Sequence, residues 1–325
     1  MNQNKLLAVK NLSISFDTDE GRFKAVDDVA FEVDKSEIVG LVGESGCGKS
    51  VTALGLLRLI PTPAGKIETG EVHFKGRDLL ALEPDDMRHV RGSEIGMIFQ
   101  EPAAALSPLH RVGKQMTEAL RLHQEIDQKT AWDIAAKWLE KVSIPDAGQR
   151  MQAYPYQLSG GMQQRIMIAM ALMLEPALII ADEPTTALDV TIAAQVFDLI
   201  KAMREKETAV LLITHDMGVV WEMCDRVMVM YASRISEQGS LETIFNKPAH
   251  PYTQGLLQSI PKLTGPRGRL EAIPGFVPSP ANYPSGCHFR DRCQHAFERC
   301  QKERPGLVDL GDGHLSACFL AEQWA

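Results

Sequence analysis

The sequence predicts an α/β fold, built on a mostly parallel sheet that helices cover on both faces. Short apolar runs typical of buried strands recur along the chain, and stretches with apolar residues at helical spacing separate them. A glycine-rich run follows one of these strands directly and precedes a helix start. Because parallel strands need crossover connections, this alternation of strands and helices favours a parallel sheet.

The amino-terminal part predicts half-buried antiparallel strands. Apolar and polar residues alternate over 8–16, 25–33 and 71–74, and Gly and Asp residues stand between these segments. We therefore expect an antiparallel β part in addition to the main sheet.

Residues 43–50 read GESGCGKS and follow the apolar run 37–42, which has the composition of a buried strand. In this pattern a glycine-rich turn precedes a helix, so backbone N–H groups can surround a triphosphate. The Lys49 ammonium would reach the β- and γ-phosphates, and the Ser50 hydroxyl would bind Mg²⁺. The candidate nucleotide-binding residues of this loop are Gly43, Glu44, Ser45, Gly46, Cys47, Gly48, Lys49, Ser50 and Val51.

Helical periodicity dominates the stretch from about Glu101 to Leu174, which we interpret as a helical insert between strands. Apolar residues recur at helical spacing after residues 130–133, a candidate capping box. Within the insert, residues 158–165 read LSGGMQQR and precede a helix-like run. A Ser-Gly-Gly turn at a helix start offers N–H donors and a positive dipole end, which predicts a second anion site. A capped core helix is the alternative.

Residues 177–183 form another buried-strand pattern, which ends in two adjacent carboxylates. Asp182 suits Mg²⁺ and Glu183 suits the activation of water, and a strand followed by a polar turn is the alternative. Further buried strands are expected over 209–213 and 227–231, with a helix over 192–203.

On these motifs the chain resembles the ATP-binding subunits of ABC transporters over nearly its full length. The resemblance implies an ABC ATPase cassette over 1–245, with a RecA-like mostly parallel sheet, an antiparallel β subdomain and a helical subdomain inserted at about 101–174. The motifs stand in the family's order, as the phosphate loop 43–50, glutamine loop 98–100, signature 158–163, carboxylate strand 177–183, D-loop 187–189 and switch histidine 213–216.

The resemblance also implies that two cassettes close head to tail, with ATP between the phosphate loop of one and the signature of the other. Glu183 would polarise the attacking water, His215 would contact the γ-phosphate, and Gln100 would sense magnesium and water. The implied magnesium ligands are Ser50, Gln100 and Asp182, and the residues implied at the cassette interface are Ser159, Gly160, Gly161, Gln163 and Asp189. Phe16 would stack on adenine, with Phe23 as the alternative, and either ring could instead belong to the core.

The chain becomes rich in Pro and Gly after residue 246, which predicts a C-terminal extension over 246–325 with little regular structure. Residues 250–257 read HPYTQGLL and residues 273–278 read IPGFVP. Both runs resemble the extension of the oligopeptide/dipeptide importer subfamily, in which related members import nickel or oligosaccharides.

Cysteines are concentrated in the extension. Of six in the chain, Cys287, Cys293, Cys300 and Cys318 fall in the last forty residues, with five, six and seventeen residues between them. Thiols stay reduced in the cytoplasm, so a metal site is preferred to disulfides. The spacing resembles the cluster-binding tail of this importer subfamily, which favours [4Fe–4S] over zinc. His288, His295 or His314 could replace a ligand, and four unligated cysteines are the remaining alternative.

Composition agrees with a peripheral protein on the cytoplasmic face of the membrane. No apolar run approaches the roughly 18 residues of a membrane span, and the amino terminus lacks a signal-peptide core. The net charge of −8 argues against nucleic acid as a partner.

The resemblance implies the ATP-hydrolysing motor of a membrane importer, most simply one for di- or oligopeptides. Its implied partners are a second ATPase subunit, two transmembrane permease subunits and an extracytoplasmic substrate-binding protein. A paralogue is favoured over a copy of this chain as the second ATPase, and coupling helices would enter a groove near Gln100 and the helical insert. The alternative is a soluble ABC-type ATPase acting on DNA or ribosomes, and a redox sensor in the cysteine tail could coexist with the motor.

Overall fold

The computed structural model describes residues 4–19, 21–186, 188–260 and 273–323. The chain divides into two compact units. The first comprises 1–6, 33–37 and 81–212, and the second comprises 7–32, 38–80 and 213–325. Among the described residues, no helix has the length and apolar character that crossing a membrane requires.

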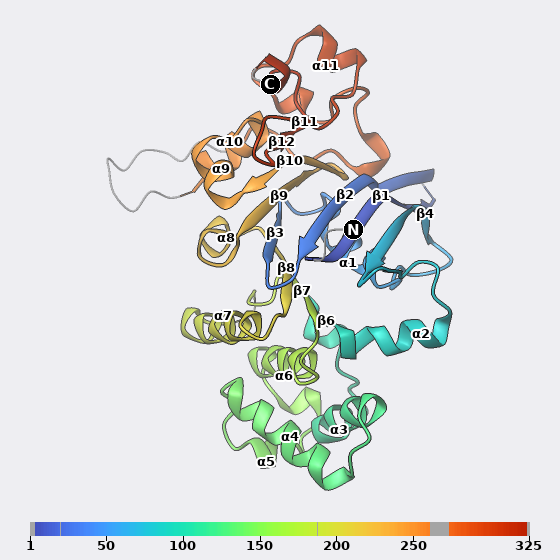
Figure 1. The fold of residues 1–325 in the computed structure, drawn as a ribbon, viewed down its shortest axis with the longest axis vertical. Coiled ribbons are helices and arrows are strands. Elements are labelled where there is room, and N and C mark those ends of the chain that lie inside the picture. Colours follow the sequence, from blue (N-terminus) through green and yellow to red (C-terminus); the bar gives the residue numbers. More distant parts are fainter. Residues whose placement is uncertain (1–3, 20, 187, 261–272, 324–325) are drawn as a thin grey trace. The chain divides into compact units, whose positions relative to one another are not determined.

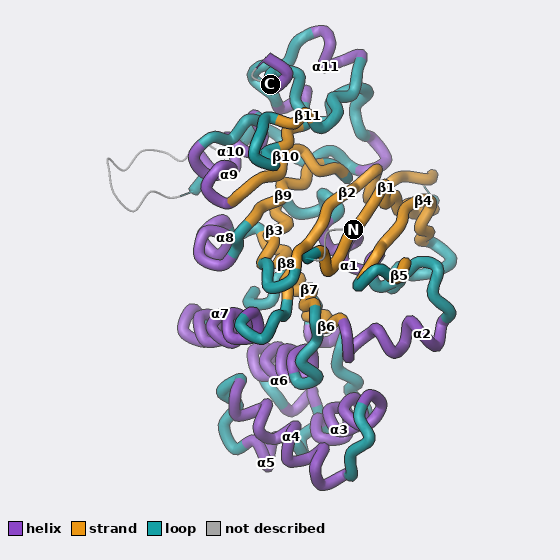
Figure 2. The backbone as a smooth tube through the Cα atoms, in the orientation of Figure 1, coloured by secondary structure: helices purple, strands orange, loops and turns teal. Residues whose placement is uncertain are grey.

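The second unit contains a four-stranded sheet in the order β2-β1-β4-β5 (Figure 2). Its strands are β1 (Lys5–Thr18), β2 (Gly21–Asp34), β4 (Gly65–Phe74) and β5 (Arg77–Asp78), the first two of which begin or end in residues of the first unit. β1 pairs antiparallel with β4, with Leu7 opposite Phe74, and β4 pairs antiparallel with β5. The alternation in the sequence thus predicted β1, β2 and β4 correctly but underestimated the length of each, and it did not predict β5.

A second group of strands in this unit has the order β11-β12-β10-β9-β3. β3 (Ile38–Val42) is parallel to β9 (Arg226–Tyr231), whereas β10 (Arg234–Ser240), β12 (Leu315–Ser316) and β11 (Val308–Asp309) add antiparallel pairs. Strands from the last part of the chain therefore continue the same hydrogen-bonded ladder as the strand before the phosphate loop. Helices of this unit are α1 (Lys49–Leu56), α8 (Met217–Met223), α9 (Leu241–Asn246), α10 (Pro251–Gln258) and α11 (Glu298–Lys302).

The first unit contains most of β8 (Ala209–Thr214), which ends in residues of the second unit, followed in strand order by β7 (Leu178–Asp182) and β6 (Ile95–Ile98), with β6 and β7 parallel. Every residue of β7 and β8 is buried, which is why these strands read as continuous apolar runs. Its helices are α2 (Pro84–His89), α3 (Val112–His123), α4 (Gln128–Lys141), α5 (Ala147–Arg150), α6 (Gly160–Leu172) and α7 (Val190–Arg204). Parallel strands combined with helices and an antiparallel sheet confirm the predicted fold class.

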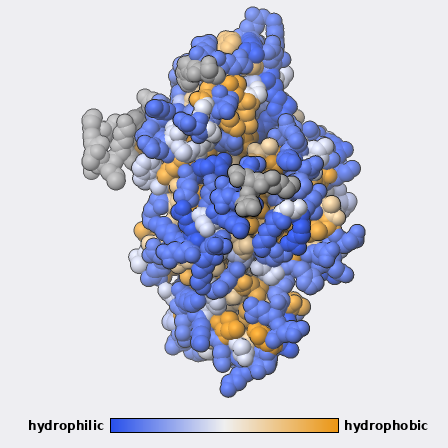
Figure 3. Space-filling view, viewed as in Figure 1, coloured by the Kyte–Doolittle hydropathy of each residue, from blue (hydrophilic) through white to orange (hydrophobic). Residues whose placement is uncertain are grey.

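Helices α3 to α6 occupy the stretch predicted as a helical insert and lie together in Figure 1. The candidate capping box at residues 130–133 is wrong, because α4 begins three residues earlier. Asp127 is its N-cap, and its carboxylate accepts a hydrogen bond from the Thr130 N–H at 2.7 Å. Figure 3 shows apolar residues at the surface over these helices, and Leu109 and Leu122 are 80% and 71% exposed.

Candidate active site

The phosphate loop runs from the end of β3 to the start of α1, and its glycines are required by close backbone contacts. Gly43 and Gly48 have φ angles of +151° and +110°. A Cβ atom at Gly43 would lie 2.2 Å from the Met230 oxygen, and one at Gly48 would lie 2.3 Å from the Ala25 oxygen. Any side chain at either position would therefore push the loop away from the neighbouring strands.

Lys49 folds back over this loop. Its Nζ donates to the carbonyl oxygens of Gly43 and Glu44 at 2.8 and 3.0 Å, and the residue is only 6% exposed. No side chain in the described part of the chain caps the start of α1, so its N–H groups and the Lys49 ammonium offer positive charge at one place. The loop thus has glycines at which no side chain fits, and it leads into a helix start without a side-chain cap. Both features fit a bound triphosphate.

Cys47 lies inside the loop and is fully buried. Burial raises the pKa of its thiol, and the neighbouring Lys49 opposes this shift only in part. The thiol therefore stays neutral at physiological pH and packs as a small apolar side chain.

The two carboxylates predicted after the buried strand lie at the end of β7, in the first unit. Asp182 is 4% exposed, and Glu183 is half-buried with a φ angle of +48°. Glu183 Oε2 accepts hydrogen bonds from Thr186 Oγ1 at 3.1 Å and from Gln100 Nε2 at 3.5 Å. The fold thus brings Gln100 to Glu183 across 83 positions of sequence. Sequence reasoning missed Thr186, although it stands only three residues after Glu183.

The signature segment begins α6 with an exposed turn. Ser159 is the N-cap, and its hydroxyl accepts from the Met162 N–H at 3.3 Å. Gln163 Nε2 donates to the Pro155 and Leu158 oxygens, which fixes the turn before the helix. Ser159 and Gly160 are exposed and Gly161 is half-buried, so the turn can meet another molecule.

Asp189 and His215 lie at the starts of two further helices. Asp189 caps α7 by accepting from the Ile192 N–H at 3.0 Å, and Ala187 of the same loop lies outside the described residues. His215 is exposed directly after β8, and the next residue, Asp216, caps α8. Asp189 thus lies on the connection before α7 and His215 on the connection after β8, where a ligand or partner can reach both side chains.

The two candidate adenine-stacking rings contact each other. Phe16 in β1 and Phe23 in β2 stack with their centroids 6.0 Å apart, and both residues are half-buried. Because the two rings are neighbours on the same sheet, Phe16 and Phe23 both stay candidates for stacking on adenine.

The prediction of an iron–sulfur cluster or zinc at the tail cysteines is wrong. Cys287, Cys293, Cys300 and Cys318 line one cavity of about 20 Å³, which has room for roughly one water molecule. The described residues include all four, and they contain no group of three or more His, Cys, Asp or Glu side chains that could hold a metal ion.

Burial raises the pKa of Cys287 to about 11, and it raises the pKa values of Cys293 and Cys318 as well. These three thiols are therefore protonated at neutral pH. Of the nearby histidines, His295 lines the same cavity, whereas His288 Nδ1 bonds to the Ala232 oxygen and His314 Nε2 bonds to Glu237. The cysteines line this cavity together with Phe297 and Phe319, and Cys300 is buried whereas Cys287, Cys293 and Cys318 are half-buried.

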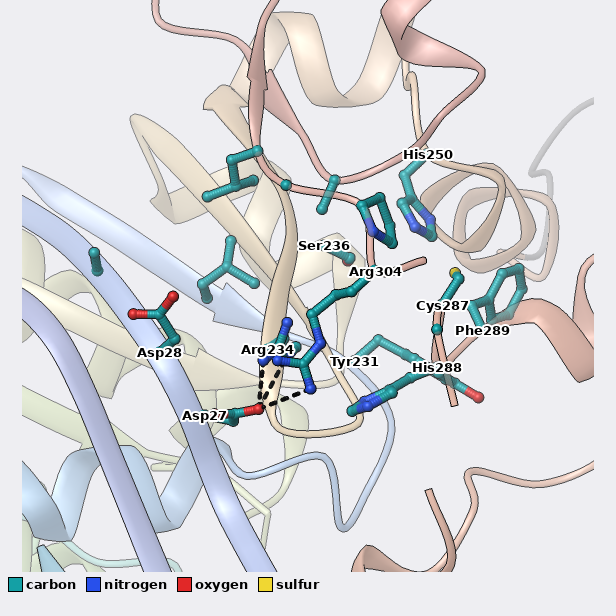
Figure 4. Close-up of a pocket in the computed structure, with 17 residues that line it drawn as sticks. Asp27, Asp28, Tyr231, Arg234, Ser236, His250, Cys287, His288, Phe289 and Arg304 are labelled. Atoms are coloured by element: carbon teal, nitrogen blue, oxygen red, sulfur yellow. Dashed lines mark hydrogen bonds and ion pairs between the residues drawn. The ribbon is translucent and has the colours of Figure 1, made fainter. Parts of the chain in front are cut away.

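The extension contacts the cassette strands within the second unit. Glu237 of β10 is fully buried and accepts from the Ala249 and His250 N–H groups at 2.6 and 3.1 Å, and it bonds to His314 Nε2 at 2.7 Å. Figure 4 shows Arg234 and Arg304 converging on Asp27 beside a cavity of about 140 Å³, with Arg304 3.3 Å from the Asp27 carboxylate. These contacts attach the extension to β2 and β10.

Comparison with known proteins agrees with this architecture. Residues 26–186 match the ABC transporter family, and residues 236–300 match the oligopeptide/dipeptide transporter C-terminal region. The chain is 48% identical over 320 residues to a probable peptide ABC transporter ATP-binding protein of Sinorhizobium fredii, with 98% of this chain and 96% of that protein covered. It is 46% identical over 322 residues to the dipeptide transport ATP-binding protein DppD of Bacillus subtilis, with 99% and 96% covered.

Solved structures extend the comparison to three dimensions. A dimeric ATP-binding cassette in a post-hydrolysis state bound to ADP and Pi gives a TM-score of 0.66 at 26% identity, and covers 72% of this chain and 98% of that one. The sequence matches favour a transporter over the alternative of a nucleic-acid or ribosome ATPase. The chain therefore belongs to the ATP-binding subunits of ABC transporters of the oligopeptide/dipeptide family, and it is the ATPase that drives a membrane importer.

Proposed function

We propose that this ATPase lies on the cytoplasmic face of the membrane and powers the import of di- or oligopeptides. ATP is hydrolysed between two cassettes. The observation that carries the cargo assignment is the full-length similarity to proteins described as peptide and dipeptide transport ATP-binding proteins, including their C-terminal region. The ATP chemistry is supported by the phosphate-loop geometry and by the Gln100–Glu183 contact.

In this proposal the phosphate loop binds the triphosphate through its backbone and Lys49, and Phe16 or Phe23 stacks on adenine. Ser50, Asp182 and Gln100 would hold Mg²⁺, which when bound neutralises phosphate charge. Glu183 accepts a proton from the attacking water, and its neighbour Gln100 orients that water. His215 contacts the γ-phosphate, so it senses whether the phosphate is present.

The exposed signature turn serves the ATP held by the partner cassette. Its supporting observation is that Ser159 and Gly160 are exposed at the start of a thirteen-residue helix, where N–H donors and the helix dipole favour a phosphate. Asp189 stands at the same kind of position on α7 and would report across the interface. We infer a paralogous ATPase subunit as the partner, together with two membrane permease subunits and an extracytoplasmic binding protein.

The membrane subunits dock on the helical part of the first unit. An open hollow of about 570 Å³ lies there, and its lining includes Arg111, Leu122, Trp132 and Met151. Leu122 is 71% exposed, which an interface with another subunit would cover. This peripheral attachment places the ATPase at the membrane.

The proposed chemistry is tested by separating nucleotide binding from hydrolysis in the assembled transporter. Glu183→Gln should keep ATP affinity and lower hydrolysis by about 10² to 10⁴, the range for a positioned general base. Lys49→Ala should instead weaken ATP binding itself, because it deletes the charge that holds the phosphates. Near-normal turnover in Glu183→Gln would remove Glu183 from this role, and equal ATP affinities of the two variants would contradict the division.

A further inference from the structure

The phosphate loop, which is proposed to bind the negatively charged triphosphate, itself contains a carboxylate, that of Glu44. Glu44 directly follows Gly43, and its side chain is 32% exposed. A negative charge in this loop repels a triphosphate unless another group neutralises it. The structure supplies that group from a residue 248 positions away, because Arg292 Nη1 and Nη2 donate to the two Glu44 carboxylate oxygens at 2.7 and 3.0 Å.

Arg292 is held from several sides. Its side chain is 5% exposed, its Nε donates to the Pro274 oxygen at 2.8 Å, and its guanidinium lies 5.7 Å from the centroid of the Tyr231 ring. A buried guanidinium with this fork geometry binds a carboxylate more specifically than a lysine could. The ion pair is therefore a built feature of the fold rather than a chance surface contact.

A second contact from the extension reaches the backbone of the same residue. The Glu44 N–H donates to the Tyr252 hydroxyl at 2.9 Å, and Tyr252 is fully buried. Its ring packs against Tyr231 and Phe289, with centroids 4.6 and 5.4 Å away. Tyr252 sits in the first turn of α10, which His250 caps by accepting from the Tyr252 N–H at 3.0 Å.

Two sequence runs of the extension thus meet at one residue of the phosphate loop. Tyr252 belongs to the HPYTQGLL run, and Pro274, which orients Arg292, belongs to the IPGFVP run. Neither run has a place in the ATP chemistry described above.

We propose that Arg292 and Tyr252 are positioning residues, through which the C-terminal extension neutralises Glu44 and holds the phosphate loop ready for ATP. The inference rests on the proposed nucleotide role of this loop. ATP binding and docking of the extension are then coupled, so each strengthens the other.

The test measures the Kd of Mg²⁺–ATP for the full-length chain. Arg292→Gln should raise Kd about tenfold, because the freed Glu44 charge repels the phosphates at the effective dielectric of a protein surface. Adding Glu44→Gln to Arg292→Gln removes that charge, so the double variant should have a Kd about fivefold lower than that of Arg292→Gln alone. Arg299→Gln is the matched control, because Arg299 is an arginine of the same extension that pairs with Glu303 and Glu322. It should bind ATP as the unchanged protein does.

Each outcome decides the inference. A double variant as weak as Arg292→Gln would overturn charge neutralisation, and unchanged Kd in Arg292→Gln would overturn the whole inference. If Lys49→Ala also left Kd unchanged, the nucleotide role of the loop would fail as well, so the two failures are distinguishable. Should Arg292→Gln not accumulate as folded protein, Tyr252→Phe carries the test, with an expected rise in Kd of about threefold and refutation by no change.

Hydrogen exchange supplies a readout that does not depend on affinity. ATP at saturation should slow amide exchange around residues 249–254 in the unchanged chain, and should slow it much less in Arg292→Gln. Equal protection in both chains would contradict the coupling.

Discussion

Replacing Gly48 by Ala is the sharpest test of the phosphate-loop geometry. The new Cβ would lie 2.3 Å from the Ala25 oxygen, about 1 Å closer than an ordinary carbon–oxygen contact. Because that oxygen belongs to the backbone of a strand, the loop must move by about 1 Å. A displacement of this size costs roughly 10²-fold where reacting or binding groups must be aligned, so we expect the Kd for ATP to rise by about 10².

Gly76→Ala is the matched control for this prediction. Gly76 lies outside the phosphate loop, between β4 and β5, and also has a positive φ angle, +79°, but a Cβ there would meet no atom within 4 Å. Its strain of about 1–3 kcal/mol is present with and without nucleotide, so it should lower stability more than affinity. The assay is a fluorescence titration with an ATP analogue, after chemical unfolding has shown that both variants are folded. Kd values that differ by less than about threefold between the two variants would refute the steric reasoning.

Three further predictions concern the rest of the chain. Burial lowers the pKa of His250 to about 4, below the unfolded value of about 6.5, so the stability it contributes is complete above pH 6.5 and is lost as pH falls toward 4. The free energy of urea unfolding should therefore change less with pH, between pH 7.5 and 5, in His250→Asn than in the unchanged chain. An equal pH dependence in both chains would contradict this. Glu237→Ala leaves three buried donors without their acceptor and should lower the free energy of unfolding by about 3 kcal/mol or more, which a loss below about 1 kcal/mol would disprove. Ser159→Arg should keep ATP binding at the loop but stop ATP-driven closure of two cassettes, seen by light scattering, and normal closure would rule out the head-to-tail arrangement.

Much of the fold was predictable because its signals are local. The buried strands before the phosphate loop and before Asp182 read as apolar runs, and the Gly-Lys-Ser pattern fixes where α1 begins. The start of α4 was placed wrongly because Asp127 and Thr130 both suit an N-cap, and only the structure shows which one accepts the hydrogen bond.

The contacts that build the site were less predictable, because they join distant positions. Nothing in the sequence pairs Glu44 with Arg292, and the motif match leaves open what the side chain of Glu44 does. The cysteine prediction failed for a related reason. The spacing of Cys287, Cys293, Cys300 and Cys318 limits which residues can meet, whereas metal binding depends on how their sulfur atoms are arranged in space.

The central claim is that this chain converts ATP hydrolysis into peptide import. The most direct measurement is uptake of a labelled dipeptide or oligopeptide by vesicles containing the complete transporter, with ATP supplied on the cytoplasmic side. We predict uptake that requires ATP and that disappears with Lys49→Ala and with Glu183→Gln in this subunit. ATP hydrolysis that proceeds without uptake of either peptide, or uptake that survives both substitutions, would contradict the account.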